Sequence, residues 1–67
     1  MSEDIYRLQK LLEHWVEHNE DHTARFINAA NEADKLGLKD VASDIQKAAE
    51  NAQEVTKYLK KALDSLK

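Results

Sequence analysis

Hydrophobic and polar residues alternate along the chain with the periodicity of two long amphipathic helices. Apolar side chains recur at spacings of three and four on both sides of Gly37. This is the a/d pattern of helices that pack as a coiled coil. In the first half, the predicted inner face comprises Ile5, Leu8, Leu12, Trp15, Asn19, His22, Phe26, Ala29, Ala33 and Leu36. In the second half, it comprises Leu38, Val41, Ile45, Ala48, Ala52, Val55, Leu59, Ala62 and Leu66.

Gly37 marks the predicted end of the first helix. The chain has no proline and no second glycine, and glycine readily adopts the left-handed conformation that closes a helix. We therefore predict a single all-α domain over residues 1–67, with a helix over about residues 3–36, a turn at Gly37 and a helix over about residues 39–66. A Schellman-type cap would bring Leu38 back toward Ala33. So short a connection makes the two helices an antiparallel hairpin.

The hairpin predicts which residues face one another and how wide the apolar surface is. The expected facing pairs are Phe26 with Ala48, His22 with Ala52, and Trp15 with Leu59. Further apolar residues flank the inner face, namely Leu11, Val16, Ile27, Ala30, Ala42, Ala49 and Leu63. They widen the apolar face beyond what one partner helix covers, as in bundles where each helix touches two others.

The small size of the chain also favours self-association. A 67-residue hairpin has one inner face for burial and is marginal alone. Chains of this size gain stability from disulfides, a structural metal or a partner subunit, and this chain has no cysteine. We therefore predict a homodimer that forms a four-helix bundle or coiled coil.

The charges narrow the classes of partner. With 13 acidic and 10 basic residues, the chain has no strongly basic face for nucleic acid. No apolar run reaches the roughly 20 residues that span a bilayer, and the N-terminus lacks the features of a signal peptide. We expect a cytoplasmic protein that binds neither nucleic acid nor membrane. Residues 1–34 carry eight acids and three bases, so a cation would be attracted to the first half.

The histidines provide the only chemistry in the sequence that indicates a function. All three, His14, His18 and His22, fall within nine residues. A spacing of four stacks successive imidazoles on one helix, so neighbouring pairs can chelate one transition-metal ion. From His14 to His22 the helix rises about 12 Å, too far for both rings to reach an ion bound at about 2 Å. A second helix must complete the site, and two chains near a two-fold axis would supply four or more nitrogens.

These residues also have structural interpretations. Polar residues on an inner face, such as Asn19 and His22, can fix helix register and oligomeric state. The spacing of three histidines, with no base among residues 11–24, favours the metal site. Glu17, Asn19, Asp21 and Trp15 are then candidates to support the ligands. The competing interpretations are a solvated face for the carboxylates and a core position for Trp15.

Several catalytic sites are excluded by spacing. A zincin helix needs His-Glu-x-x-His, but Asn19 follows His18. A di-iron bundle needs Glu three residues before His, and the three positions concerned hold Leu11, Trp15 and Asn19. The chain also has no nucleophile-base arrangement and no glycine-rich phosphate loop. We do not expect an enzyme.

The segment His14-Trp15-x-x-His18-x-x-x-His22 resembles the signature of the CooJ-type nickel chaperones, small helical proteins associated with nickel-enzyme maturation. The resemblance implies a homodimer that binds Ni(II) at its interface, with the three histidines as ligands and Trp15 as the motif aromatic. A nickel enzyme or its maturation factors would be the partner. The end of this chain carries no histidine-rich tail, so high-capacity nickel storage is not expected.

Three functions remain open from the residues themselves. Imidazole suits Ni(II), Cu(II) and Zn(II) alike, so the choice of nickel depends on the resemblance. The first alternative is a structural or adaptor bundle whose histidines form a polar core layer. The second is an oligomer stabilised by a structural Zn(II).

Overall fold

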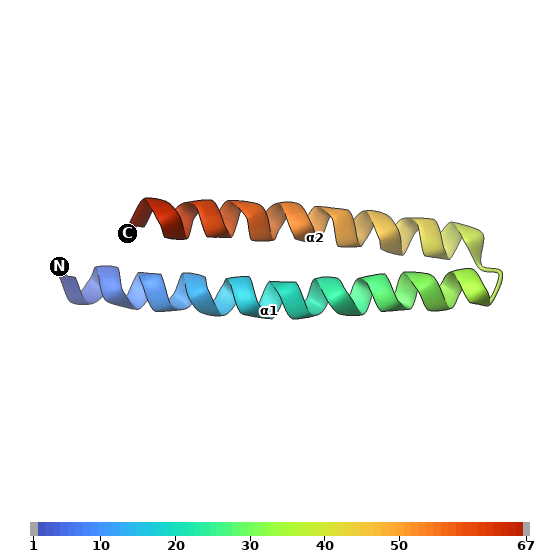
Figure 1. Cartoon of the computed structure of the whole chain (residues 1–67), viewed down its shortest axis with the longest axis horizontal. Coiled ribbons are helices and arrows are strands. Elements are labelled where there is room, and N and C mark those ends of the chain that lie inside the picture. The colour runs from blue at the N-terminus through green and yellow to red at the C-terminus, as the bar shows by residue number, and fades with distance from the viewer. Residues whose placement is uncertain (1, 67) are drawn as a thin grey trace.

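The chain folds as a helical hairpin in the computed structural model, which describes residues 2–66. Met1 and Lys67, the two ends of the predicted domain, lie outside these residues. Helix α1 spans Ser2–Lys35 and α2 spans Lys39–Leu66. They lie side by side and antiparallel, with the turn at one end and both described ends of the chain at the other (Figure 1). The resulting rod measures 53 × 14 × 11 Å. The predicted all-α hairpin is confirmed.

The turn has the predicted cap. Gly37 takes a φ of +79°, in the left-handed region. The backbone N–H of Leu38 donates to the carbonyl of Ala33 at 2.9 Å, and that of Gly37 donates to the carbonyl of Asp34 at 3.0 Å. This pair of bonds defines a Schellman motif, which satisfies carbonyls that the helix end would otherwise leave unpaired. Across the turn, the Lys39 Nζ lies 2.8 Å from the Asp34 carboxylate.

The inner face between α1 and α2 differs from the predicted one. Small side chains dominate it, and its buried residues are Leu12, Thr23, Ala30, Ala33, Ala49, Ala52 and Thr56. The prediction was right for Leu12, Ala33 and Ala52. It placed Ala30 and Ala49 beside the inner face, whereas the structure buries them.

The predicted core positions of Trp15 and Phe26 are wrong for the single chain. Trp15 is 44% exposed and Phe26 36% exposed, and Ala48, the expected partner of Phe26, is also exposed. The cause is the width of the apolar surface. Each helix turns its small residues inward, where the backbones approach closely, and one neighbouring helix cannot also cover the large side chains on the flank.

Within residues 2–66, neither helix is both long enough and apolar enough to cross a membrane.

Candidate metal centre

The three histidines form a continuous row on α1, here called the histidine ladder (His14, His18 and His22). The ring centroids of His14 and His18 are 5.6 Å apart, with the rings nearly parallel at 15°. Those of His18 and His22 are 4.6 Å apart, with the rings at 88°. Nitrogens that share one ion lie at most about 4.2 Å apart. The His18–His22 pair is therefore the closer of the two to a chelating arrangement.

The ladder runs from solvent toward a partly covered flank of the hairpin. His14 and His18 are exposed and His22 is half-buried. Beyond His22 the row continues with Phe26, whose ring centroid lies 6.3 Å away at an interplanar angle of 27°. Because residues three and four apart are neighbours on a helix, His18 also borders exposed Trp15. One edge of the ladder is therefore apolar and aromatic.

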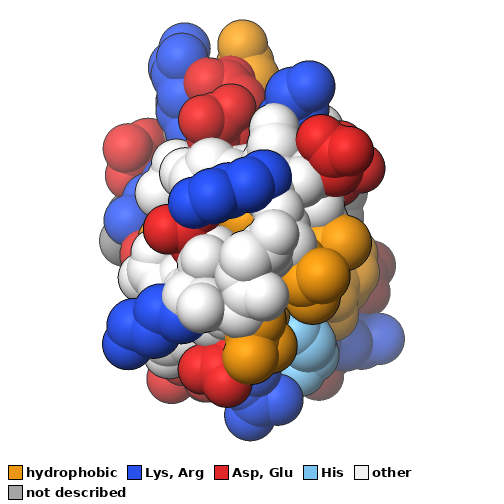
Figure 2. Space-filling view, turned by 90° about the vertical axis from the view of Figure 1, so that its right-hand side faces the viewer, with side chains coloured by type: hydrophobic (Ala, Val, Ile, Leu, Met, Phe, Trp, Pro, Cys, Tyr) orange, Lys and Arg blue, Asp and Glu red, His pale blue; other side chains and the backbone are white. Residues whose placement is uncertain are grey.

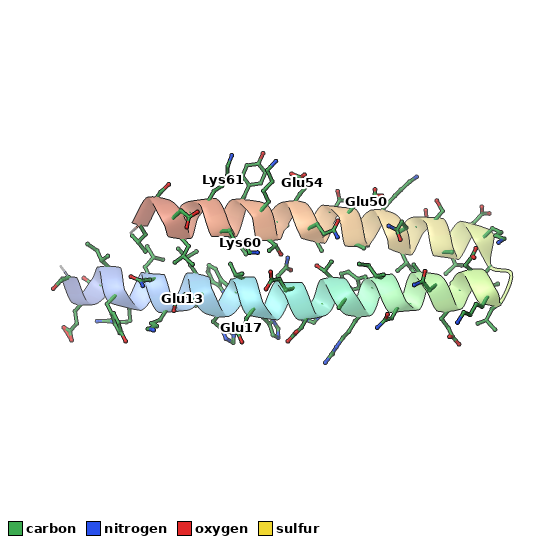
Figure 3. All side chains as sticks on the ribbon, in the orientation of Figure 1. Glu13, Glu17, Glu50, Glu54, Lys60 and Lys61 are labelled. Carbon is green, nitrogen blue, oxygen red and sulfur yellow. The ribbon has the colours of Figure 1, made fainter. Side chains whose placement is uncertain are left out.

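The other edge of the ladder carries carboxylates. Glu17 and Asp21 each follow a ladder histidine by three residues, and both are exposed. Among residues 2–66 neither makes an ion pair, whereas Glu20 lies 2.9 Å from Nζ of Lys60 on α2. Figure 3 shows Glu17 on the side of α1 that faces away from α2, and Lys60 turned toward α1. The free carboxylates give this edge a negative field that attracts cations.

Asn19 serves the hairpin itself. Its Nδ2 donates to the carbonyl oxygen of Ala52 and to the hydroxyl of Thr56, each at 2.7 Å. Its backbone carbonyl accepts from the hydroxyl of Thr23 at 2.8 Å. Both hydrogen bonds that the Asn19 side chain donates go to α2 and not to the ladder. The contacts therefore agree with the structural interpretation of Asn19 as a residue that fixes the register of two helices.

Comparison with known proteins places the chain in a family. The model of the family described as a domain of unknown function, DUF8180, matches residues 8–66. The chain belongs to the DUF8180 family. An uncharacterized protein of Archaeoglobus fulgidus is 40% identical over 58 residues, which cover 87% of this chain and 92% of the relative. No solved structure matches the chain.

In this DUF8180 chain, one copy does not assemble a complete ion site. Over residues 2–66, no group of three or more histidine, cysteine or acidic side chains is placed to hold an ion. The reason is the helical rise, which carries each imidazole about 6 Å beyond the preceding one. The ladder offers pairs of nitrogens, and an ion that prefers four or more ligands needs others from elsewhere.

Sequence reasoning missed the polar residues on α2 that position the ladder's helix. Thr56 accepts the Asn19 bond, and Lys60 pairs with Glu20. A search for apolar periodicity does not select either residue, because a threonine or lysine between apolar residues resembles a solvent-facing position. Their height along the rod could have identified them. In an antiparallel hairpin that turns at Gly37, residues 52–60 lie beside residues 14–22.

Proposed function

We propose that this chain is a small dimeric transition-metal-binding protein, a nickel chaperone or carrier for nickel-enzyme maturation, which binds Ni(II) through His14, His18 and His22 at its dimer interface. One observation carries the proposal: three imidazoles lie in an unbroken row along one helix, two of them exposed. Imidazole is a preferred ligand for late divalent transition metals. The choice of nickel, and of a nickel enzyme or its maturation factors as partner, comes from the resemblance of the His-Trp-x-x-His-x-x-x-His segment to the CooJ-type chaperones.

The environment of the ladder suits a carrier. Neutral imidazoles bind an ion without forming a closed cage, and exposed ligands let it enter and leave. The carboxylates of Glu17 and Asp21 lie beside the ladder without lysine or arginine partners among the described residues, so they raise the local concentration of cations. Trp15 and Phe26 border the ladder with apolar surface on which a second copy can pack.

Calorimetric titration tests the proposal. Ni(II), Zn(II) and Cu(II) are titrated at neutral pH into the wild type, into His18→Ala, and into the control Asn28→Ala, which alters an exposed polar residue of α1 outside the ladder. We expect saturable Ni(II) binding near one ion per dimer in the wild type and control, and affinity at least about tenfold lower in His18→Ala. Circular dichroism verifies that all three remain helical. Unchanged binding in His18→Ala would remove His18 from the site.

Two other functions are outcomes of the same titration. The absence of saturable heat with any of the three ions would favour a structural or adaptor bundle, an alternative supported by the polar contacts of Asn19 within the hairpin. Zn(II) retained against a weak chelator, together with loss of the dimer when it is stripped, would indicate a structural zinc.

A further inference from the structure

The hairpin carries a second row of apolar side chains that its own helices leave uncovered. On α1 this row runs through Leu8, Leu11, Trp15, Phe26 and Ala29, and on α2 through Val41, Ala48, Val55 and Ala62; we call it the exposed apolar face. All nine residues are exposed, and Val55 reaches 51%. Leu8, Trp15, His22 and Ala29 follow at intervals of seven, as do the four residues on α2. A strict seven-residue repeat keeps one side of a helix against a partner.

This face lies on one side of the rod, together with histidine. Figure 2 looks along the hairpin from the turn end and shows hydrophobic side chains gathered on the right-hand flank, with histidine beside them. Charged side chains, other side chains and backbone make up most of the remainder. On a helix, the Trp15–His22 row and Glu20 lie on opposite flanks of Asn19. Glu20 there pairs with Lys60, so the opposite side of the hairpin is polar. Among residues 2–66, the exposed apolar face is therefore the broad side best suited to apolar contact.

The accessible area matches the size of a missing partner surface. The chain exposes 5,205 Å², whereas a compact monomer of 7.7 kDa would expose about 4,300 Å². The excess is about 900 Å², and a standard interface buries about 800 Å² on each partner. One interface of ordinary size would therefore bring the area per chain to the value expected of a compact protein.

The arrangement of residues on α1 is complementary to itself. The helix spans residues 2–35, and its midpoint falls between His18 and Asn19. If a second α1 lies antiparallel about that midpoint, Leu8 faces Ala29 of the partner, Leu11 faces Phe26 of the partner, and Trp15 faces His22 of the partner. Large side chains then meet smaller ones, and the indole stacks on an imidazole. A two-fold axis requires such self-complementarity, because each patch must bind its own copy.

The apolar row on α2 is centred at the same height along the rod as the midpoint of α1. Val55 lies in the middle of its row, with Ala48 and Ala62 seven residues away on either side. The hydrogen bonds from Asn19 to Ala52 and Thr56 set Val55 beside Asn19. An axis that crosses α1 at its midpoint therefore crosses α2 near Val55. The facing alanines on either side of this point let the two α2 helices approach closely.

We propose that a second copy of this chain covers the exposed apolar face with its turn at the opposite end, so that the two-fold axis passes between His18 and Asn19 and α1 packs on α1 of the partner. The inference rests on the proposed metal function only for its consequence at the ladder. His18 then faces His18 of the partner, and His14 approaches His22 of the partner. By symmetry, the dimer holds either a single ion on the axis or an even number of ions. With both turns at the same end, α1 would pack on α2 of the partner, and the two ladders would lie on diagonally opposed helices.

Spin-label distances decide between the two arrangements. The chain has no cysteine, so Glu3→Cys and Gln53→Cys each place one nitroxide per chain. Both positions are exposed, Glu3 near the end of the rod and Gln53 near its middle. The labels are measured without metal and with Zn(II), which is diamagnetic. At Glu3 we expect a separation of about 45 Å, since each label stands about 15 residues from the axis at about 1.5 Å per residue. At Gln53, which lies near the axis but on the polar side of the hairpin, we expect about 20–25 Å, the width of two helices, which shows that the dimer forms.

Other results overturn the inference in distinguishable ways. A Glu3 separation of about 20–25 Å, the width of two helices, would show that both turns lie at the same end; the proposed metal function would then still be decided by calorimetry. Absence of dipolar coupling in both variants, with and without Zn(II), would show a monomer and remove the arrangement and the shared metal site together. A separation of about 45 Å without any metal binding would retain the dimer and discard the carrier.

Discussion

At the scale of the residue, Asn19 determines how the two helices align. Apolar contacts tolerate sliding, but a hydrogen bond depends strongly on distance and angle. Both amide hydrogens of Asn19 are engaged with α2, one at the carbonyl of Ala52 and one at the hydroxyl of buried Thr56. The neighbouring ladder residues, His18 and His22, are thereby held at a fixed height relative to α2.

Replacing Asn19 with alanine tests this role. We expect Asn19→Ala to lower the free energy of unfolding by about 1–2 kcal/mol relative to Asn28→Ala, because two hydrogen bonds are lost and the Thr56 hydroxyl is left buried without its donor. Both variants gain the same helix propensity, so the comparison cancels that effect. Denaturant unfolding at one protein concentration provides the measurement. Equal stabilities for the two variants would mean that Asn19 contributes nothing beyond its propensity.

At the scale of the element, the turn depends on a single backbone conformation. Gly37 holds a φ of +79°, and a Cβ built there meets no heavy atom within 4 Å. A side chain at this position therefore has space, and its cost comes from the backbone alone. We expect Gly37→Ala to destabilise the hairpin by about 1–2 kcal/mol and Gly37→Asn to cost less, because asparagine tolerates the left-handed region. Thermal unfolding compares the two, and an equal loss in both would contradict a purely conformational origin.

The sequence could predict the elements of the hairpin better than the packing between them. The helices and the turn were predictable because their causes are local: a 3.6-residue periodicity, and a lone glycine between two amphipathic stretches. The inner face was predicted only in part. Each helix carries apolar residues on two adjacent flanks, and the choice between them depends on tertiary packing. Ala30 and Ala49 pack inward because small residues permit close approach, which leaves Trp15 and Phe26 outside.

The candidate site, like the inner face, could be predicted only in part. The spacing of four predicted the ladder, since neighbours on a helix follow from helical geometry alone. The degree of exposure of each histidine could not be predicted, because it depends on which flank of α1 meets α2. The contacts around the ladder, from Asn19 to Thr56 and from Glu20 to Lys60, join residues more than thirty positions apart. Such pairs follow from the hairpin register and not from local pattern.

At the scale of the whole molecule, the hairpin is one-sided. Its polar side carries the Glu20–Lys60 ion pair, and its other side carries the exposed apolar face with the ladder at the edge. In the proposed dimer, Glu17 and Asp21 of the two chains approach the same axis, where like charges repel. A divalent ion held by the ladder offsets that repulsion. Metal binding and dimer formation should therefore be coupled, each strengthening the other by the same factor.

Sedimentation measurements can quantify this coupling. When free Ni(II) is 100 times its dissociation constant, an ion bound only by the dimer stabilises it by about 2.7 kcal/mol, which corresponds to about 100-fold tighter association. We expect that change in the wild type at pH 7.5 and no change in His18→Ala. If Ni(II) binds but the dimer dissociation constant stays the same, the ion is held within one chain and the two ladders do not share it.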